Sequence, residues 1–179
     1  MTTEYLLNRE VEHVLAALTP ENSAVCQVML HTGLRVSDVL ALTLEDSQKP
    51  RFWVTEAKTG KRRMVGLPEA LRAEIWRLAL PGVSPWAFPG RDPSQHRTRQ
   101  AVWKDVKRAA AAFRLPQNAA PHSFRKVYAV DLLEKYGDID RVQRALNHDR
   151  EATTTIYACA DALLTAKRLR KAARYGKRL

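Results

Sequence analysis

The chain has little of what disulfide frameworks, metal sites and membrane proteins require. Its 179 residues include two cysteines, Cys26 and Cys159, which lie far apart and outside any C-x-x-C spacing. That argues against a zinc site or a disulfide framework and fits a reducing, cytoplasmic compartment. No apolar run approaches the ~20 residues of a membrane span, and no signal peptide opens the chain. A cluster of carboxylates that could hold Mg²⁺ is also missing, so we expect neither a metal nor another cofactor.

Acidic residues are outnumbered as well. Against 19 Asp and Glu stand 30 Lys and Arg, which gives a formal net charge of +11 at pH 7. Such an excess favours a polyanionic partner, of which DNA or RNA is the usual one, although a merely soluble basic protein would show the same charge. Apolar residues make up 45% of the chain, which predicts a folded core rather than disorder. The length suits one domain.

Apolar periodicity predicts a mainly helical fold with one small antiparallel hairpin. Strand-favouring residues occupy 51–57 and 63–67, on either side of a turn at 58–62. A stretch rich in proline, glycine and polar residues, 81–97, predicts a surface loop. Helical patterns cover about 9–18, 22–31, 37–42, 98–113, 123–136 and 152–160, with one more after Asp138 and a last one reaching about residue 175.

Helix ends can be predicted from single residues. Gly33 and Gly137 are expected to end helices in the left-handed conformation. Ser37 is expected to cap the amides of the helix that begins there, and Asp138 to cap the helix after it. Pro68 is expected at the first position of a helix, where its missing N–H costs nothing. Arg35 would then lie at a helix–loop–helix corner, where the backbone on both sides fixes the direction of a side chain.

Five short strings contain the residue types that phosphodiester chemistry uses. They are TGLRVSD at 32–38, KTGK at 58–61, HSFR at 122–125, LNH at 146–148 and TTIY at 154–157. In this order they resemble the catalytic domain of the tyrosine recombinase, or phage integrase, family, over about residues 8–160. The resemblance implies the mainly α fold with a small antiparallel sheet described above.

The resemblance assigns the phosphate to two arginines. Arg35 and Arg125 match the family's phosphate-binding arginines, and a guanidinium donates two parallel hydrogen bonds to phosphate oxygens. Asp38 matches the acidic residue that holds the first arginine in place. Either arginine alone, in so basic a chain, would more often be an ordinary surface residue.

Tyr157 matches the family's nucleophile. Its phenol, with a usual pKa near ~10, needs a base or a cationic pocket to react at neutral pH. His122 is the better candidate for the base, since histidine titrates near neutrality and this one lies three residues before Arg125. His148 matches a second histidine, expected to hydrogen-bond or pack near the phosphate.

The remaining expected contacts are basic. Lys58 matches the hairpin lysine that protonates the leaving 5′ oxygen, with Lys61 as a close competitor. A solvated turn lysine is the ordinary alternative for both. The residues expected to contact DNA lie on the hairpin and on the helix at 98–113: Lys61, Arg62, Arg63, Arg99, Lys104, Lys107 and Arg108.

The family resemblance implies a site-specific DNA recombinase or integrase that works through a covalent 3′-phosphotyrosine, with double-stranded DNA and a homotetramer as partners. We expect one catalytic domain over residues 1–179, with a basic C-terminal segment at about 161–179. We expect no amino-terminal core-binding domain in this chain, which would make it a single-domain member or a chain whose amino-terminal part is missing. A catalytically silent DNA-binding regulator and a type IB topoisomerase remain as alternatives.

Overall fold

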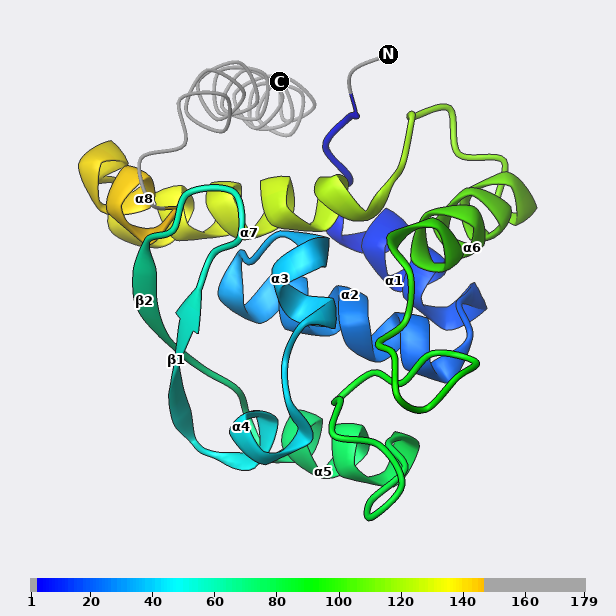
Figure 1. Cartoon of the computed structure of the whole chain (residues 1–179). Helices are drawn as coiled ribbons and strands as arrows, with labels where there is room; N and C mark the ends of the chain where they lie inside the picture. The colour runs from blue at the N-terminus through cyan, green and yellow to red at the C-terminus, as the bar shows by residue number, and fades with distance from the viewer. Residues whose placement is uncertain (1–2, 147–179) are drawn as a thin grey trace, which may run out of the picture. The chain divides into compact units, whose positions relative to one another are not determined.

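Helices make up most of the described chain. The computed structural model describes residues 3–146, and its elements are labelled in Figure 1. The strands are β1 (Arg51–Thr55) and β2 (Arg62–Gly66), which form a two-stranded antiparallel sheet. The helices are α1 (Asn8–Ala17), α2 (Pro20–Thr32), α3 (Val36–Leu40), α4 (Leu44–Gln48), α5 (Glu69–Leu78), α6 (Arg99–Ala112), α7 (Pro121–Tyr136) and α8 (Ile139–Ala145). The predicted mainly α fold with one small hairpin is confirmed.

The chain forms two compact units, and the boundary between them falls inside α7, after Tyr128. The first unit contains every element from α1 to the first half of α7, and the second begins at Ala129 and includes α8. Among the described residues, no helix combines the length and the apolar character that a membrane crossing needs.

Helix α2 is the centre of the first unit. It packs against α1, α3, α5, α6 and strand β2, and Figure 1 shows it in the middle of these elements. A helix with neighbours on several sides buries residues all round instead of along one stripe. For this reason the buried residues of α2 follow each other closely, as in the set Ala24, Val25, Val28 and Met29. The partners of α2 bury narrower faces, such as Val11 on α1.

The hairpin has one face toward the core and one toward solvent. Phe52 pairs with Val65 and both are buried, whereas the neighbouring pair, Trp53 and Met64, is exposed. Successive side chains of a strand point to opposite faces, which gives this alternation. The sequence predicted the hairpin itself from its strand-favouring residues.

Several local predictions need correction. Helix α3 begins at Val36, one residue earlier than predicted, so that Arg35 occupies the N-cap position and the predicted capping by Ser37 is wrong. Pro68 is the N-cap of α5 rather than its first residue. Helix α7 begins at Pro121, two residues before its predicted start. The sequence analysis also missed α4, a five-residue helix too short to show a periodicity of its own.

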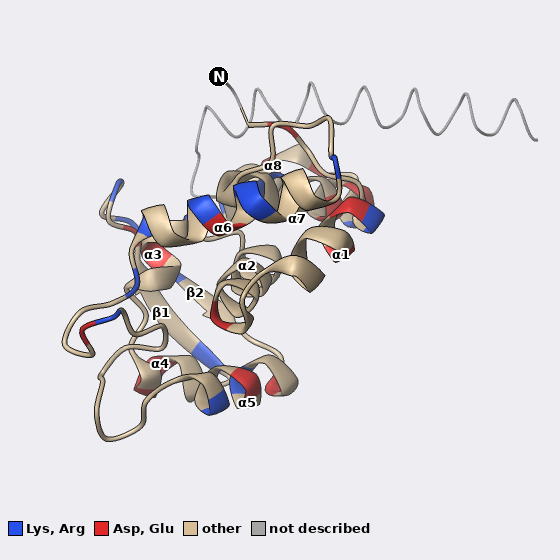
Figure 2. Cartoon of the chain, turned by 90° about the vertical axis from the view of Figure 1, so that its right-hand side faces the viewer, with Lys and Arg blue, Asp and Glu red and all other residues tan. Residues whose placement is uncertain are grey.

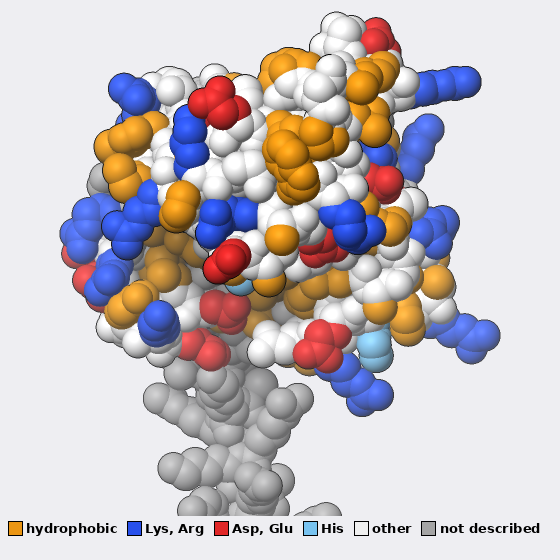
Figure 3. Space-filling view, turned by 90° about the horizontal axis from the view of Figure 1, so that it is seen from below, with side chains coloured by type: hydrophobic (Ala, Val, Ile, Leu, Met, Phe, Trp, Pro, Cys, Tyr) orange, Lys and Arg blue, Asp and Glu red, His pale blue; other side chains and the backbone are white. Residues whose placement is uncertain are grey.

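The loop between α5 and α6 is attached to the rest of the first unit through Ala87 and Phe88. The Ala87 amide donates to the Leu42 carbonyl at 2.9 Å, and Phe88 is buried. On the side of α4 and α5, Lys and Arg side chains are interspersed with acidic and hydrophobic ones (Figure 3). This face therefore does not present a continuous basic surface.

Candidate active site

The first predicted phosphate arginine lies between two helices. Helix α2 ends at Gly33 in the left-handed conformation (φ +64°), which favours glycine, and α3 begins at Val36. Arg35 is the extended residue just before α3, and its side chain is 13% exposed. Its Nη1 donates to Oε2 of Glu56 at 2.5 Å. Structured backbone on both sides thus sets the direction of this arginine.

Asp38 joins the arginine corner to the hairpin. Its side chain is buried, and Oδ1 accepts a hydrogen bond from the Ala57 amide at 3.0 Å. Ala57 lies one residue before Lys58, so this bond holds the beginning of the lysine turn beside Arg35. The sequence assigned Asp38 to hold Arg35, but the carboxylate bonded to the Arg35 guanidinium is that of Glu56, and the side chain of Asp38 instead attaches the hairpin backbone to this corner.

The second predicted phosphate arginine reaches the same corner from α7. Arg125 is 1% exposed, and its Nη1 donates to the carbonyl of Gly33, two residues before Arg35. Helix α7 approaches Gly33 so closely that a β-carbon there would lie 2.3 Å from Cδ1 of Tyr128. The fold thus attaches Arg125 to the backbone two residues before Arg35, although the two arginines are far apart in the sequence.

A further arginine shares the carboxylate that binds Arg35. Nε of Arg63 lies 3.1 Å from Oε1 of Glu56, and its Nη2 donates to the Thr32 carbonyl at 2.8 Å. Burial lowers the pKa of Arg63, and the negative charge of Glu56 opposes that effect. Its side chain is 11% exposed. We therefore propose a structural role for Arg63 in place of the DNA contact predicted from the sequence.

Sequence reasoning missed Glu56, although a signal for it exists. The side chain is 0% exposed, and glutamate is almost never fully buried unless it is paired. Phe52 and Val54 are the buried residues of β1, and Glu56 follows at the next position with the same parity. A charged residue in an inward register was therefore the visible sign of a buried ion pair.

The two candidate lysines lie on the turn that connects β1 and β2. Lys58 and Lys61 are both exposed, and the turn is closed by a hydrogen bond from the Glu56 amide to the Lys61 carbonyl at 2.9 Å. The neighbouring Arg62 is exposed too, and its guanidinium lies 5.3 Å from the centre of the Trp53 ring. The structure does not separate Lys58 from Lys61 as the leaving-group acid.

His122 lies in the first turn of α7, as the second residue of the helix, and is half-buried. Arg125 follows it by three residues, a spacing that places both side chains on neighbouring positions of one helix face. The predicted relation between the base and the second arginine is thus compatible with the observed helix.

Helix α6 carries the remaining predicted DNA contacts, and they fall into two kinds. Arg99 and Lys104 are exposed on the helix surface, whose basic positions are visible in Figure 2. Lys107 donates to Oδ1 of Asn118 instead, and Arg108 bonds to the Asp105 carboxylate at 2.6 Å. The side chains of Lys107 and Arg108 therefore form hydrogen bonds within the protein.

Asp105 is a buried anchor between α6 and the start of α2. Burial alone would raise the pKa of its carboxyl. Hydrogen bonds from Asn22 Nδ2 at 2.8 Å and the Thr19 amide at 2.9 Å, together with the Arg108 guanidinium, outweigh burial and lower that pKa. This carboxylate fixes the basic helix on the body of the first unit.

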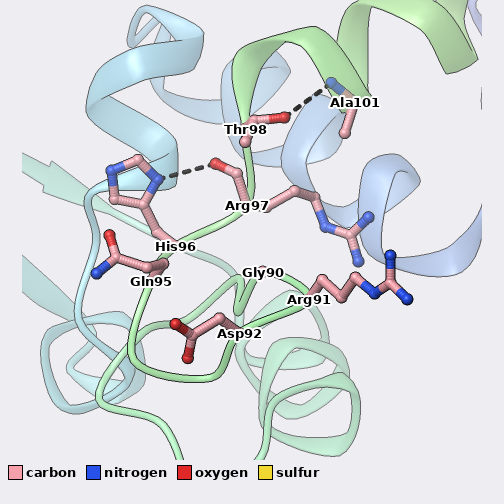
Figure 4. Close-up of a pocket in the computed structure, with 8 residues that line it drawn as sticks. All are labelled: Gly90, Arg91, Asp92, Gln95, His96, Arg97, Thr98 and Ala101. Carbon is pink, nitrogen blue, oxygen red and sulfur yellow. Dashed lines mark hydrogen bonds between the residues drawn. The ribbon is translucent and has the colours of Figure 1, made fainter.

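A pocket lies where the loop enters α6 (Figure 4). His96 Nδ1 is 2.8 Å from the Arg97 carbonyl, and Thr98 caps the helix by accepting from the Ala101 amide at 3.1 Å. Arg97 is also 3.7 Å from a carboxylate oxygen of Glu21. None of these residues was among the predicted site residues.

Two predicted catalytic residues, His148 and Tyr157, lie outside the described residues, as does the basic segment at about 161–179. Within residues 3–146, no group of three or more His, Cys, Asp or Glu side chains is arranged to hold a metal ion.

Comparison with known proteins places the chain in a family. Residues 4–163 match the phage integrase family. The tyrosine recombinase XerD of Caulobacter vibrioides is 33% identical over 166 residues, which cover 83% of this chain and 54% of that protein. The XerA recombinase structure has a TM-score of 0.70 at 23% identity, over 88% of this chain and 60% of the other.

A structure of the XerH site-specific recombinase bound to its difH substrate, before cleavage, has a TM-score of 0.66 at 23% identity. It covers 86% of this chain and 50% of XerH. The chain spans about half the length of the curated relatives it matches. The fold, the order of the five strings and the family match agree with one another, and the chain belongs to the phage integrase family.

Proposed function

We propose that this chain is the catalytic part of a site-specific DNA recombinase or integrase. The observation that supports this most directly is that Arg125 bonds to the Gly33 carbonyl, two residues before Arg35, while Asp38 attaches the beginning of the lysine turn to the same segment. A scissile phosphate gains negative charge on its oxygens in the transition state, and cations already in place stabilise it most. Two guanidinium groups can bind the two non-bridging oxygens.

The proposed reaction exchanges one phosphate ester for another. The phenolic oxygen of Tyr157 attacks the phosphorus, and the bond to the 5′ oxygen breaks. The products are a 3′-phosphotyrosine and a free 5′ hydroxyl. A hydroxyl of another strand then attacks the phosphotyrosine and releases the enzyme. Because each step replaces one ester by another, the sequence of steps needs no ATP, and the charge on the phosphate is met by side chains.

Proton transfers accompany both bond changes. In this scheme His122 takes the proton of the phenol, and His148 donates a hydrogen bond to the phosphate. The 5′ oxygen needs a proton as it leaves, and Lys58 on the exposed turn supplies it, with Lys61 as the alternative.

Chemistry can decide between the two lysines. In a substrate with sulfur in place of the bridging 5′ oxygen, the leaving group departs without being protonated, because a thiolate is a good leaving group. An alanine variant of the acid should lose its cleavage rate on normal DNA and regain it on the sulfur substrate. An alanine variant of the other lysine should show no such rescue.

Double-stranded DNA is the proposed substrate, as the difH complex of XerH illustrates for a protein of this fold. Lys61, Arg62, Arg99 and Lys104 are exposed and would contact its phosphates. Exchange between two duplexes requires four active sites, so we propose a homotetramer assembled on DNA. A cytoplasmic location would give such an enzyme access to chromosomal DNA.

The test does not require knowledge of the target sequence. Genomic DNA of the source organism is sheared and nicked at random, so that cleavage near a nick releases a short strand and traps the covalent complex. Adducts are recovered by SDS–potassium precipitation and sequenced. We expect adducts at a small set of sites with the wild type and none with Tyr157→Phe.

Other outcomes would identify the alternatives. DNA binding without an adduct under any condition would contradict the proposal and favour a silent regulator. Relaxation of supercoiled plasmid without strand exchange would favour a topoisomerase.

A further inference from the structure

Glu56 has a buried carboxylate but no role in the reaction steps described above. It lies directly after β1, at the point where the hairpin turns away from the core, and is fully buried. Burying an isolated carboxylate is strongly unfavourable, so its two oxygens need cationic or hydrogen-bonding partners.

Each oxygen of Glu56 forms an ion pair with a different arginine. Oε2 accepts from Nη1 of Arg35 at 2.5 Å, and Oε1 lies 3.1 Å from Nε of Arg63. Arg63 is itself attached to the end of α2 through the Thr32 carbonyl. The result is a continuous connection from the end of α2 through Arg63 and Glu56 to the guanidinium of Arg35.

This connection restrains the side chain of Arg35, whose rotational freedom would otherwise slow the reaction. An arginine side chain loses rotamer entropy when it is fixed, and a reaction that fixes it in the transition state is slowed by that loss. A carboxylate that fixes it beforehand removes this cost. A guanidinium has five N–H donors on three nitrogens, so a bond at Nη1 is compatible with paired donation to a phosphate.

We propose that Glu56 is a positioning residue, which orients Arg35 toward the scissile phosphate by bridging it to Arg63. This inference rests on the proposed function for its catalytic consequence. Glu56 itself touches no reacting atom and acts through Arg35.

The first experiment compares four proteins on nicked DNA at single turnover: the wild type, Glu56→Gln, the double variant Glu56→Gln/Arg63→Met, and Glu69→Gln as an exposed control. Glutamine keeps the shape but presents an amide N–H₂ to one of the two guanidinium groups. We expect the rate of adduct formation to fall roughly tenfold or more, because a misplaced catalytic group costs that much. DNA affinity should change less than twofold, and Glu69→Gln should match the wild type.

The double variant separates positioning from mere charge neutralisation. With Arg63→Met, no second buried guanidinium requires the carboxylate. If Glu56 only neutralised Arg63, the double variant would recover the wild-type rate, and the proposal would be overturned. If Glu56 positions Arg35, the double variant folds with a normal melting temperature and remains slow.

A second measurement does not depend on activity. The side-chain ¹⁵N–¹H signals of Arg35, assigned by their absence in Arg35→Lys, report whether rotation of its guanidinium is hindered. We expect hindered, resolved signals in the wild type and averaged signals in Glu56→Gln. Unchanged signals in Glu56→Gln would overturn the positioning role even if no adduct forms with any protein. A lack of adduct with the wild type, by contrast, counts against the recombinase proposal alone.

Discussion

Replacement of Gly33 by alanine should destabilise the first unit more than the same change at a glycine of equal conformation. Gly33 has φ +64°, and its amide donates to the Met29 carbonyl at 2.8 Å as the C-cap of α2. A β-carbon there would lie 2.3 Å from Cδ1 and 2.5 Å from Cε1 of Tyr128. Carbon atoms in van der Waals contact are separated by about 3.5–4.0 Å, so the ring or the backbone must move.

Two contributions set the magnitude. An alanine in the left-handed conformation costs about 1–2 kcal/mol relative to glycine. Overpacking against the Tyr128 ring adds about 1–3 kcal/mol, typical of inserting an extra methyl group into a filled space. The free energy of unfolding should therefore fall by about 2–5 kcal/mol, a large share of the about 5–15 kcal/mol that stabilises an ordinary domain.

Gly137 provides a matched control for the backbone contribution. It has φ +65°, caps α7 with a hydrogen bond to the Leu133 carbonyl at 2.8 Å, and has open space where a β-carbon would lie. Gly137→Ala should therefore cost about 1–2 kcal/mol. Urea denaturation followed by far-ultraviolet circular dichroism measures both variants. If Gly33→Ala lowers the free energy of unfolding no more than Gly137→Ala does, the inferred close contact between Tyr128 of α7 and Gly33 is contradicted. Adding Tyr128→Leu to Gly33→Ala should recover the overpacking part.

Further predictions concern the basic helix and the core. Asp105→Asn should lower the free energy of unfolding at pH 7 by about 2–3 kcal/mol, because it weakens charged hydrogen bonds. Folding lowers the pKa of Asp105, so its contribution to the free energy of unfolding is present above the usual carboxyl pKa and disappears as the pH falls through the lower folded pKa. Urea titrations at pH 7 and pH 3 would show this loss. If Asp105→Asn lowered the free energy of unfolding equally at both pH values, this reasoning would be contradicted. Burial raises the pKa of the Cys26 thiol, so in a Cys159→Ser background it should react with a thiol reagent only after urea is added; rapid labelling of the native protein would show otherwise. Arg99→Ala and Lys104→Ala should each weaken DNA binding and reduce the salt slope by about 1, measured by fluorescence anisotropy, whereas an unchanged slope would exclude a phosphate contact.

Local features of the chain were predictable because their causes lie within a few residues. Strand-favouring residues on either side of a turn, such as Phe52 and Val54, predicted the hairpin, and Gly33 and Gly137 predicted two helix ends. The candidate site residues were assigned from the resemblance of five short strings to the strings of a known family. Predictions for His148 and Tyr157 stay predictions, because both lie outside the described residues.

Tertiary structure decided the contacts that join distant parts of the chain. No local pattern states that Arg125 would bond to the Gly33 carbonyl, or that Glu56 would bridge Arg35 and Arg63. Those contacts depend on how α7 and the hairpin pack against the end of α2, and packing is the sum of many contacts between distant segments. The sequence by itself determined which residues could carry the chemistry. Only the fold decided which of the basic side chains lie inside, because a buried charge needs a partner whose position is set by the rest of the chain.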